Sequence, residues 1–266
     1  LTINEINSAF NGYLFRVKLQ NNGNSCESFS NFATLNLLPK PIVNSPITIV
    51  QCENDATIDG FSIINLKQKE DLSLSPNAIN ETFSYYKTEQ GAIDADVLQL
   101  ISNPESYDNN LGNTVWIRVV NSNNCFNVAQ LNIVVTSSQI PSSFSLEFKE
   151  CDDFISNFSE SNDGITTFDF SSAKQAILDE LPISNTYSVH FYANQNDALS
   201  ELNPIPEVAI PGSNQYGMVS SYRNTAPNLQ QIWVRVDNAL SNECFALGPY
   251  INLIVTKKPD IKLTDE

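Results

Sequence analysis

The sequence predicts an all-β chain of tandem immunoglobulin-like or fibronectin-like β-sandwich domains with short helical insertions. A strand–turn–strand pattern occurs three times along the 266 residues. Asparagine- and serine-rich turns separate apolar segments of five to eight residues, as is typical of strands. About seven such strands in roughly 95 residues is the size of an immunoglobulin-like sandwich.

The threefold pattern is an apolar strand with a central arginine, a polar turn, a cysteine and a second apolar strand. Its copies span residues 13–37, 115–135 and 232–255. The arginines are Arg16, Arg118 and Arg235, and the cysteines are Cys26, Cys125 and Cys244. Because side chains alternate across a strand, we expect the arginines on an outer sheet face near exposed carboxylates.

A second pattern precedes the last two copies. It contains a strand ending in cysteine, an Asp-Gly turn, an aromatic strand and an Asp-Ala pair. These are Cys52, Asp59-Gly60, residues 83–88 and Asp94-Ala95, and then Cys151, Asp163-Gly164, residues 189–194 and Asp197-Ala198.

Together the patterns predict an array of domains. Residues 1–43 form the C-terminal part of an immunoglobulin-like domain, 44–139 a β-sandwich repeat, 140–258 a repeat with a longer insertion, and 259–266 the start of a further repeat. The larger repeat has extra residues mainly between Asn203 and Asn228. Prolines at the joints stiffen short linkers.

Local signals place the remaining elements. Ser171 or Ser172 can cap a helix over residues 173–181 that Pro182 ends. Residues 66–72 predict a turn of helix, and residues 92–101 a short helix. In the first segment, Tyr13 is placed to form a tyrosine corner, in which the hydroxyl bonds backbone a few residues upstream.

Charge and composition exclude several functions. Thirty acidic residues against 14 basic ones give a net charge of −16, which argues against nucleic acid or an anionic membrane as a partner. No apolar run approaches the roughly 20 residues of a membrane span. A single histidine and the lack of phosphate-loop, zinc or nucleophile-elbow motifs indicate that the chain is not an enzyme.

The two full units resemble repeats of large cell-surface adhesins of gliding Bacteroidota that are exported by type IX secretion, similar to the mobile gliding-motility adhesin. The residues that carry the resemblance are Cys151-Asp152, Asp163-Gly164, Phe168-Asp169-Phe170, Tyr192, Asp197-Ala198, residues 232–236 and Cys244, with their counterparts in the middle unit. The resemblance implies an extracellular, outer-membrane-attached stalk segment with an adhesive role in gliding or attachment. It also implies partners among neighbouring repeats, surface polysaccharide and outer-membrane gliding or secretion components.

Two disulfide pairings suit the five cysteines. Pairing within units joins Cys52 with Cys125 and Cys151 with Cys244, and leaves Cys26 a partner outside the chain. Pairing across joints joins Cys26 with Cys52 and Cys125 with Cys151. The first is favoured because strands running on in line through a joint would separate the second set, whereas bridged Cα atoms lie within roughly 7 Å. Reduced, buried thiols are the alternative to both.

Acidic loops follow the first cysteine of each unit. Their carboxylates are Glu53, Asp55 and Asp59, and then Asp152, Asp153 and Asp163. Such oxygens could gather around Ca²⁺, which takes six to eight oxygen ligands. The alternative is a pair of solvated turns, because Asp-Gly is a common turn sequence.

Trp116 and Trp233 occupy matching strand positions, where core packing is the expected role and sugar stacking the alternative. A carbohydrate- or protein-binding module, with residues 203–228 as the recognition loop, is the alternative function. His190 is expected on a strand surface.

Overall fold

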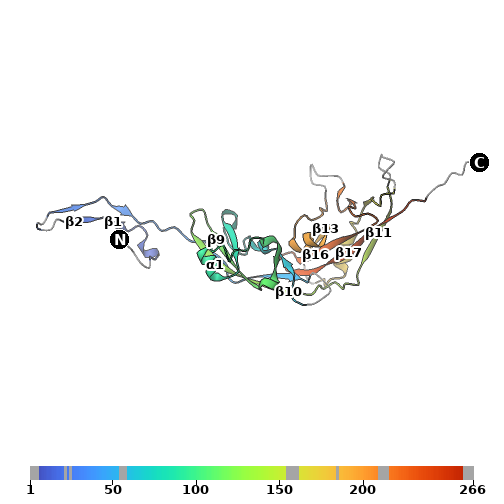
Figure 1. Ribbon diagram of the computed structural model, residues 1–266, viewed down its shortest axis with the longest axis horizontal. Coiled ribbons are helices and arrows are strands. Elements are labelled where there is room, and N and C mark those ends of the chain that lie inside the picture. The colour runs from blue at the N-terminus through green and yellow to red at the C-terminus, as the bar shows by residue number, and fades with distance from the viewer. Residues whose placement is uncertain are drawn as a thin grey trace, which may run out of the picture.

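The computed structural model describes residues 6–20, 23, 26–53, 59–153, 162–183, 186–208 and 216–259. Two β-rich bodies lie end to end along the long axis, and a thin N-terminal segment extends beyond the first (Figure 1). We refer to residues 44–139 as the first repeat and to residues 140–258 as the second repeat.

The main sheet of the first repeat has the order β5-β10-β9-β7. Its strands are β5 (Ile47–Cys52), β7 (Thr82–Tyr86), β9 (Thr114–Val120) and β10 (Phe126–Thr136). β9 and β10 form an antiparallel hairpin, β7 pairs antiparallel with β9, and β5 runs parallel to β10.

The second repeat reproduces this sheet in the order β11-β17-β16-β13. Its strands are β11 (Leu146–Cys151), β13 (Tyr187–Tyr192), β16 (Leu229–Asn238) and β17 (Cys244–Thr256). β11 is parallel to β17, and the other pairs are antiparallel.

A smaller sheet forms the second layer of each repeat. In the first repeat it pairs β6 (Ile63–Ile64) with β8 (Tyr107–Asp108), and in the second it has the order β12-β15-β14, with β12 (Thr167–Phe168), β14 (Gly217–Met218) and β15 (Ser221–Arg223). The third, sixth and seventh strands of the second repeat share one sheet, as in an immunoglobulin-like sandwich. The predicted all-β fold is confirmed.

Short helices and 3-10 turns occur between the strands. They are α1 (Glu89–Asp94), α2 (Ala173–Asp179), α3 (Gln195–Ser200) and the 3-10 turns η1 (Ser8–Phe10), η2 (Leu66–Lys69), η3 (Ala78–Asn80), η4 (Pro104–Ser106) and η5 (Asn109–Leu111). The helix predicted over 173–181 and the turn at 66–72 are therefore present. The predicted serine cap is wrong, because Ser172 stands at the N-cap of α2 but makes no side-chain capping hydrogen bond. The helix predicted over 92–101 instead starts at Glu89 and ends at Asp94, because Thr88 caps its start and Ala95, at φ 53°, breaks it.

Each repeat has its own apolar core. Alternate residues of β9 are buried, namely Val115, Ile117 and Val119, and so are their counterparts Ile232, Val234 and Val236 in β16. Each such side chain stabilises the fold by about 1.5–3 kcal/mol. The two cores contain no shared residue.

Among the described residues of the N-terminal segment, Val43 alone packs against a core, that of the first repeat, and it is only partly buried. Its ladders pair β1 (Leu14–Phe15) with β4 (Ala33–Thr34) and β2 (Lys18–Gln20) with β3 (Glu27–Phe29). The Tyr13 ring is 52% exposed and packs edge-on against Phe10. Within the described residues its hydroxyl makes no hydrogen bond, so the predicted tyrosine corner is not formed there; Leu1 and Ile3 lie outside the described residues.

Candidate functional site: the joint between the repeats

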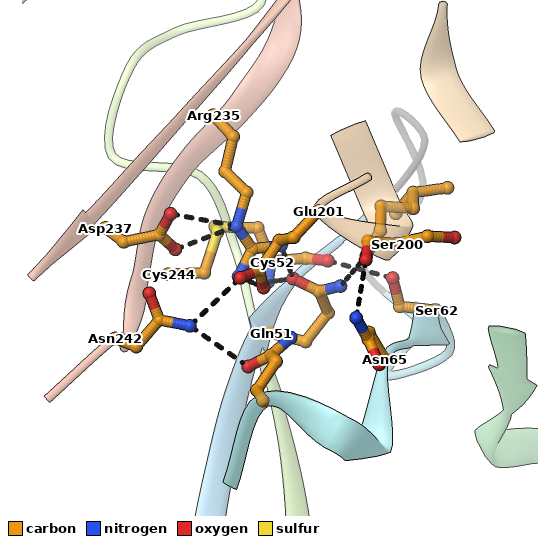
Figure 2. Close-up of polar contacts among 12 residues, drawn as sticks. Gln51, Cys52, Ser62, Asn65, Ser200, Glu201, Arg235, Asp237, Asn242 and Cys244 are labelled. Atoms are coloured by element: carbon orange, nitrogen blue, oxygen red, sulfur yellow. Dashed lines mark hydrogen bonds and ion pairs between the residues drawn. A yellow bond between two sulfur atoms is a disulfide. The ribbon is translucent and has the colours of Figure 1, made fainter. Parts of the chain in front are cut away.

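The first repeat meets the second at a compact, buried contact that we name the joint. It is formed by the end of β5, the β6–η2 segment, the C-terminal end of α3, and the β16–β17 hairpin (Figure 2). Its polar residues and cysteines are Gln51, Cys52, Ser62 and Asn65 of the first repeat and Ser200, Glu201, Arg235, Asp237, Asn242 and Cys244 of the second.

A disulfide joins Cys52 to Cys244 across the joint, with Cα atoms 5.4 Å apart and a sequence separation of 192. Both cysteines are buried. The predicted pairs Cys52–Cys125 and Cys151–Cys244 are therefore wrong, and so is the alternative that joins Cys26 to Cys52. Cys125 and Cys151 form no disulfide in the structure, so they are not paired with each other either. Cys26 is exposed directly before β3, and its partner outside the chain stays a prediction.

The parallel pairing of β5 with β10 explains the correction. Cys52 lies opposite Thr136, at the end of β10, whereas Cys125 precedes the start of that strand. An 11-residue strand separates its ends by about 35 Å at roughly 3.3 Å per residue, so the two cysteines of one repeat lie at opposite ends of it. The end of one repeat meets the beginning of the next, and Cys52 reaches Cys244 there.

Apolar side chains surround the disulfide. Tyr192, Ala198, Leu199 and Leu247 are buried with the two cysteines, and Ile63 and Trp233 pack against this cluster. Trp233 thus packs at the joint rather than in the centre of its own repeat. Trp116, its counterpart in the first repeat, is half-buried.

Gln51 is fully buried, and every hydrogen-bonding position of its side-chain amide is used. Nε2 donates to the carbonyls of Ile63 (2.8 Å) and Leu199 (3.1 Å). Oε1 accepts from Arg235 Nη1 (2.5 Å) and from the backbone N–H of Cys52 (3.1 Å). One side chain therefore binds its own repeat and the neighbour with no unsatisfied group.

Arg235 is the centre of the charges in the joint. Its Nε donates to both carboxylate oxygens of Asp237 (2.8 and 3.0 Å), and Nη2 forms an ion pair with Glu201 Oε1 (2.8 Å). Arg235 is fully buried, so its predicted place on an outer sheet face near exposed carboxylates is wrong. Alternation does put this residue outside the core of its own repeat, but the first repeat covers that face.

Burial and charge act against each other here. Burial is the main cause that raises the pKa of Asp237 to about 6. The positive charge of Arg235 lowers this pKa, and the negative charge of Glu201 raises it. Burial also works to lower the pKa of Arg235, but Asp237 and Glu201 outweigh burial and raise it, so Arg235 stays charged. The joint therefore has two carboxylates that share one cation.

The first repeat also caps a helix of the second. The last carbonyls of a helix have no partner inside the helix. At the end of α3, the carbonyl of Leu199 accepts from Gln51, and that of Ser200 accepts from Asn65 Nδ2 (2.7 Å). Lys69 Nζ donates to the Ser241 carbonyl (2.8 Å) and extends the contact to the β16–β17 turn.

The linker of the joint is held as well. Gln139 donates its backbone N–H to the Phe245 carbonyl (2.7 Å), and Ile140 is buried in the core of the second repeat. The Tyr250 hydroxyl lies 2.7 Å from Ser138 Oγ. Disulfide, polar cluster and linker together fix one repeat on the other.

A family model described as the Flavobacterium inter-domain disulphide bond domain matches residues 48–140 and 147–259. The chain belongs to this family. Its two tandem inter-domain disulphide domains are the two repeats, and the Cys52–Cys244 bond is a disulfide between such domains. A family of flavobacterial domains also fits the predicted resemblance to surface-protein repeats of Bacteroidota.

No curated protein matches the chain. Among solved structures, a similar chain is the bradyzoite-specific antigen BSR4 from Toxoplasma gondii, at 10% identity and a TM-score of 0.16. The match covers 55% of this chain and 56% of that one, so this chain spans little more than half of the antigen.

The acidic loops of the two inter-domain disulphide domains cap turns. Oε1 of Glu53 accepts from the Gly60 N–H and Oδ2 of Asp152 from the Gly164 N–H, each at 2.8 Å. Asp59 and Asp163 each accept a hydrogen bond from the backbone N–H two residues further on. Asp153 forms an ion pair with Arg223. Asp55 lies outside the described residues. In the described part of the chain, no three His, Cys, Asp or Glu side chains converge as a metal site, so the predicted calcium ligands are not brought together there.

Sequence reasoning missed Gln51, Asn65, Glu201 and Asp237. A signal existed for one of them, because Asp237 follows Arg235 by two residues and therefore shares its strand face. Gln51 lies near the end of a strand, and Asn65 and Glu201 lie at helix ends. Only the neighbouring repeat distinguishes these three polar residues from exposed ones.

Proposed function

We propose that this tandem is a non-catalytic stalk segment of a repetitive, extracellular bacterial adhesin that is attached to the outer membrane and serves gliding motility or surface attachment. Type IX secretion is the proposed export route. The Cys52–Cys244 bond, which covalently joins two successive domains, is the observation that carries this proposal. A disulfide favours an oxidising, extracellular setting.

The position of the disulfide determines how the tandem carries tension. A pull on the two ends of the chain passes from Cys52 through the sulfur–sulfur bond to Cys244, and the loop between them carries no load. That loop of 192 residues corresponds to roughly 600–700 Å of extended chain at about 3.3–3.6 Å per residue. Most of both repeats is thereby protected from stretching, a property suited to a stalk.

Stiffness at the joint supports the same function. The Gln51 amide and the Arg235 guanidinium are fully buried, so bending at the joint would expose or unpair them. Leaving such groups unsatisfied costs about 1–3 kcal/mol each. Among the described residues, no helix is both long and apolar enough to cross a bilayer. The proposed partners are neighbouring repeats, surface polysaccharide and outer-membrane gliding or secretion components.

Single-molecule stretching tests the load path. The tandem is held by handles at both ends, and the C52S/C244S variant is compared with the unmodified chain. We expect the variant to gain roughly 600–700 Å of extension on unfolding, whereas C125S/C151S gains none. Equal extension of the variant and the unmodified chain would show that the bond is not formed.

A cell experiment tests the role itself. C52S/C244S is introduced into the parent protein, with the exposed substitution Q231A as control. We expect normal export but loss of attachment under shear flow or of gliding, while Q231A cells behave as the parent does. Unchanged attachment and gliding in C52S/C244S cells would overturn the stalk function.

A further inference from the structure

The disulfide of the joint is closed off from solvent. Cys52 is 0% exposed and Cys244 is 5% exposed. Thiol–disulfide exchange requires a thiolate to reach one of the two sulfurs. We propose that the joint is a gate on this exchange: a thiol reduces the Cys52–Cys244 bond only when the two repeats part, and the polar contacts across the joint set how often they part. This inference deepens the proposed stalk function and rests on it for its biological role.

The cover over Cys52 comes from the second repeat. The side chains of that repeat that are buried in one cluster with the two cysteines are Tyr192, Ala198, Leu199 and Leu247. Neither cysteine belongs to the hydrophobic core of its own repeat. Parting the repeats therefore uncovers Cys52 while both cores stay folded.

Cys151 shows the same strand position without such a cover. It ends β11 as Cys52 ends β5, and each lies opposite a threonine of a parallel strand. Among the described residues no buried cluster contains Cys151, and it is exposed. The end of the strand by itself leaves a cysteine accessible, so the burial of Cys52 is a property of the docked joint.

Three side chains of the first repeat donate or accept hydrogen bonds across the joint, around the disulfide. Gln51 binds α3 and Arg235, Asn65 binds the last carbonyl of α3, and Lys69 binds the β16–β17 turn. Parting the repeats breaks these bonds together, because all of them end on the second repeat. Removing one of them should therefore make parting more frequent.

Gln51 is the most sensitive of these positions. It directly precedes Cys52 in β5 and is fully buried, and its Oε1 also accepts from the Cys52 N–H (Figure 2). Replacing it by alanine leaves Arg235 Nη1 and the Leu199 carbonyl without this partner in the closed joint, whereas water satisfies both groups in the open joint. The substitution thus destabilises the closed form relative to the open form.

Reduction by dithiothreitol proceeds in two exchanges. One thiolate of the reagent attacks a sulfur of the opened joint, forms a mixed disulfide and expels the other cysteine as a thiolate. The second thiol of the reagent loses its proton and attacks the reagent's own sulfur in the mixed disulfide, which closes a cyclic disulfide and expels the remaining cysteine thiolate. The protein bond gains two electrons and two protons, and the reagent loses the same number.

Reduction rates of the folded, full-length chain test the gate. The other three cysteines are replaced in the background C26S/C125S/C151S, so that only Cys52 and Cys244 can react. Samples taken during incubation with dithiothreitol are alkylated, and mass spectrometry counts the alkylated cysteines. Because exchange waits for opening, we expect reduction to be at least about a hundredfold slower than that of oxidised glutathione in the same buffer.

Matched variants separate parting of the joint from unfolding of a repeat. Q51A should accelerate reduction at least about tenfold. Q231A, the same change at an exposed glutamine, should leave the rate unchanged. G164A destabilises the second repeat at the turn that binds Asp152, next to Cys151 and away from the joint, so it should change the rate less than about twofold.

Three results would overturn the gate. Reduction as fast as that of oxidised glutathione would show that the closed joint does not protect the bond. An unchanged rate in Q51A would show that the polar contacts do not hold the repeats together. Equal acceleration by G164A and Q51A would show that reduction follows unfolding of a repeat.

These results are distinguishable from a failure of the stalk function. Alkylation before any reductant is added shows whether the Cys52–Cys244 bond is present at all. Attachment and gliding are measured separately, on cells that carry C52S/C244S, so a bond that is present but easily reduced would overturn the gate and leave the stalk function standing.

Discussion

The buried guanidinium of Arg235 forms ion pairs with two carboxylates. Asp237 receives two hydrogen bonds from it and Glu201 one ion pair, while Gln51 takes a further donor. Because the carboxylates outnumber the arginine, ionising both leaves an uncompensated negative charge in the joint. Burial is the main cause that raises the pKa of Asp237 to about 6, and the charge of Glu201 adds to it against that of Arg235.

This pKa predicts a pH dependence of stability. Between about pH 4 and pH 6, Asp237 carries a proton in the native state but not in the unfolded chain, where its pKa is near 3.8. The stabilisation is therefore complete below about pH 4 and is lost as pH rises through about 6. We expect D237N to lack this contribution of about 2–3 kcal/mol. Denaturant unfolding from pH 4 to 7 measures it, with the exposed substitution D179N as control. If the unfolding free energies of D237N and of the unmodified chain depend on pH in the same way, the raised pKa does not belong to Asp237.

Gln51 allows a second test at a single residue. Q51A leaves Arg235 Nη1 and the Leu199 and Ile63 carbonyls without their partner, so we expect a loss of about 2–4 kcal/mol of unfolding free energy. The matched change Q231A, at an exposed glutamine of β16, should stay within about 0.5 kcal/mol. Calorimetry of both variants checks this, and similar losses would show that the buried amide is not special.

At the scale of elements, the same turn occurs in both repeats with different surroundings. Gly60 and Gly164 follow Asp59 and Asp163 and have φ values of 80° and 77°, which favour glycine. A Cβ on Gly60 would meet nothing within 4 Å, whereas one on Gly164 would lie 2.7 Å from the backbone nitrogen of Asn228.

The two turns predict different costs for the same substitution. G60A should cost only the backbone strain, about 1–2 kcal/mol. G164A adds a collision with backbone that cannot move aside easily, so we expect at least about 1 kcal/mol more. Thermal unfolding of the two variants makes the comparison, and equal losses would contradict the contact at Asn228.

At the scale of the whole molecule, the disulfide joins two separate cores into one unit. Each repeat has its own hydrophobic core, so without the bond the two could unfold independently. Closing a loop of 192 residues stabilises the folded state by about 5 kcal/mol in the chain-entropy model.

Removing the bond should therefore change both stability and cooperativity. For C52S/C244S we expect a loss of about 3–5 kcal/mol and separation of one unfolding transition into two. Reductant should act on the unmodified chain in the same way, and C125S/C151S should leave its unfolding unchanged. A single, unshifted transition in C52S/C244S would mean that the polar joint alone couples the repeats.

The sequence by itself determined the β fold, the repeats and the helix at 173–181, because these follow from alternation, turn residues and the helix-terminating Pro182, which act over a few neighbouring residues. It also marked Cys52, Cys244 and Arg235 as recurring positions. It could not show that β5 runs parallel to β10, because strand direction in a sheet depends on contacts distant in sequence.

Only the tertiary structure decided what the marked residues do. The parallel pairing places the two cysteines of each repeat at opposite ends, and the end-to-end arrangement then brings Cys52 to Cys244. The same arrangement buries Arg235, which alternation alone assigns to an exposed face. A local pattern fixes which way a side chain points from its own repeat, but what covers it is fixed by the packing of the neighbouring repeat.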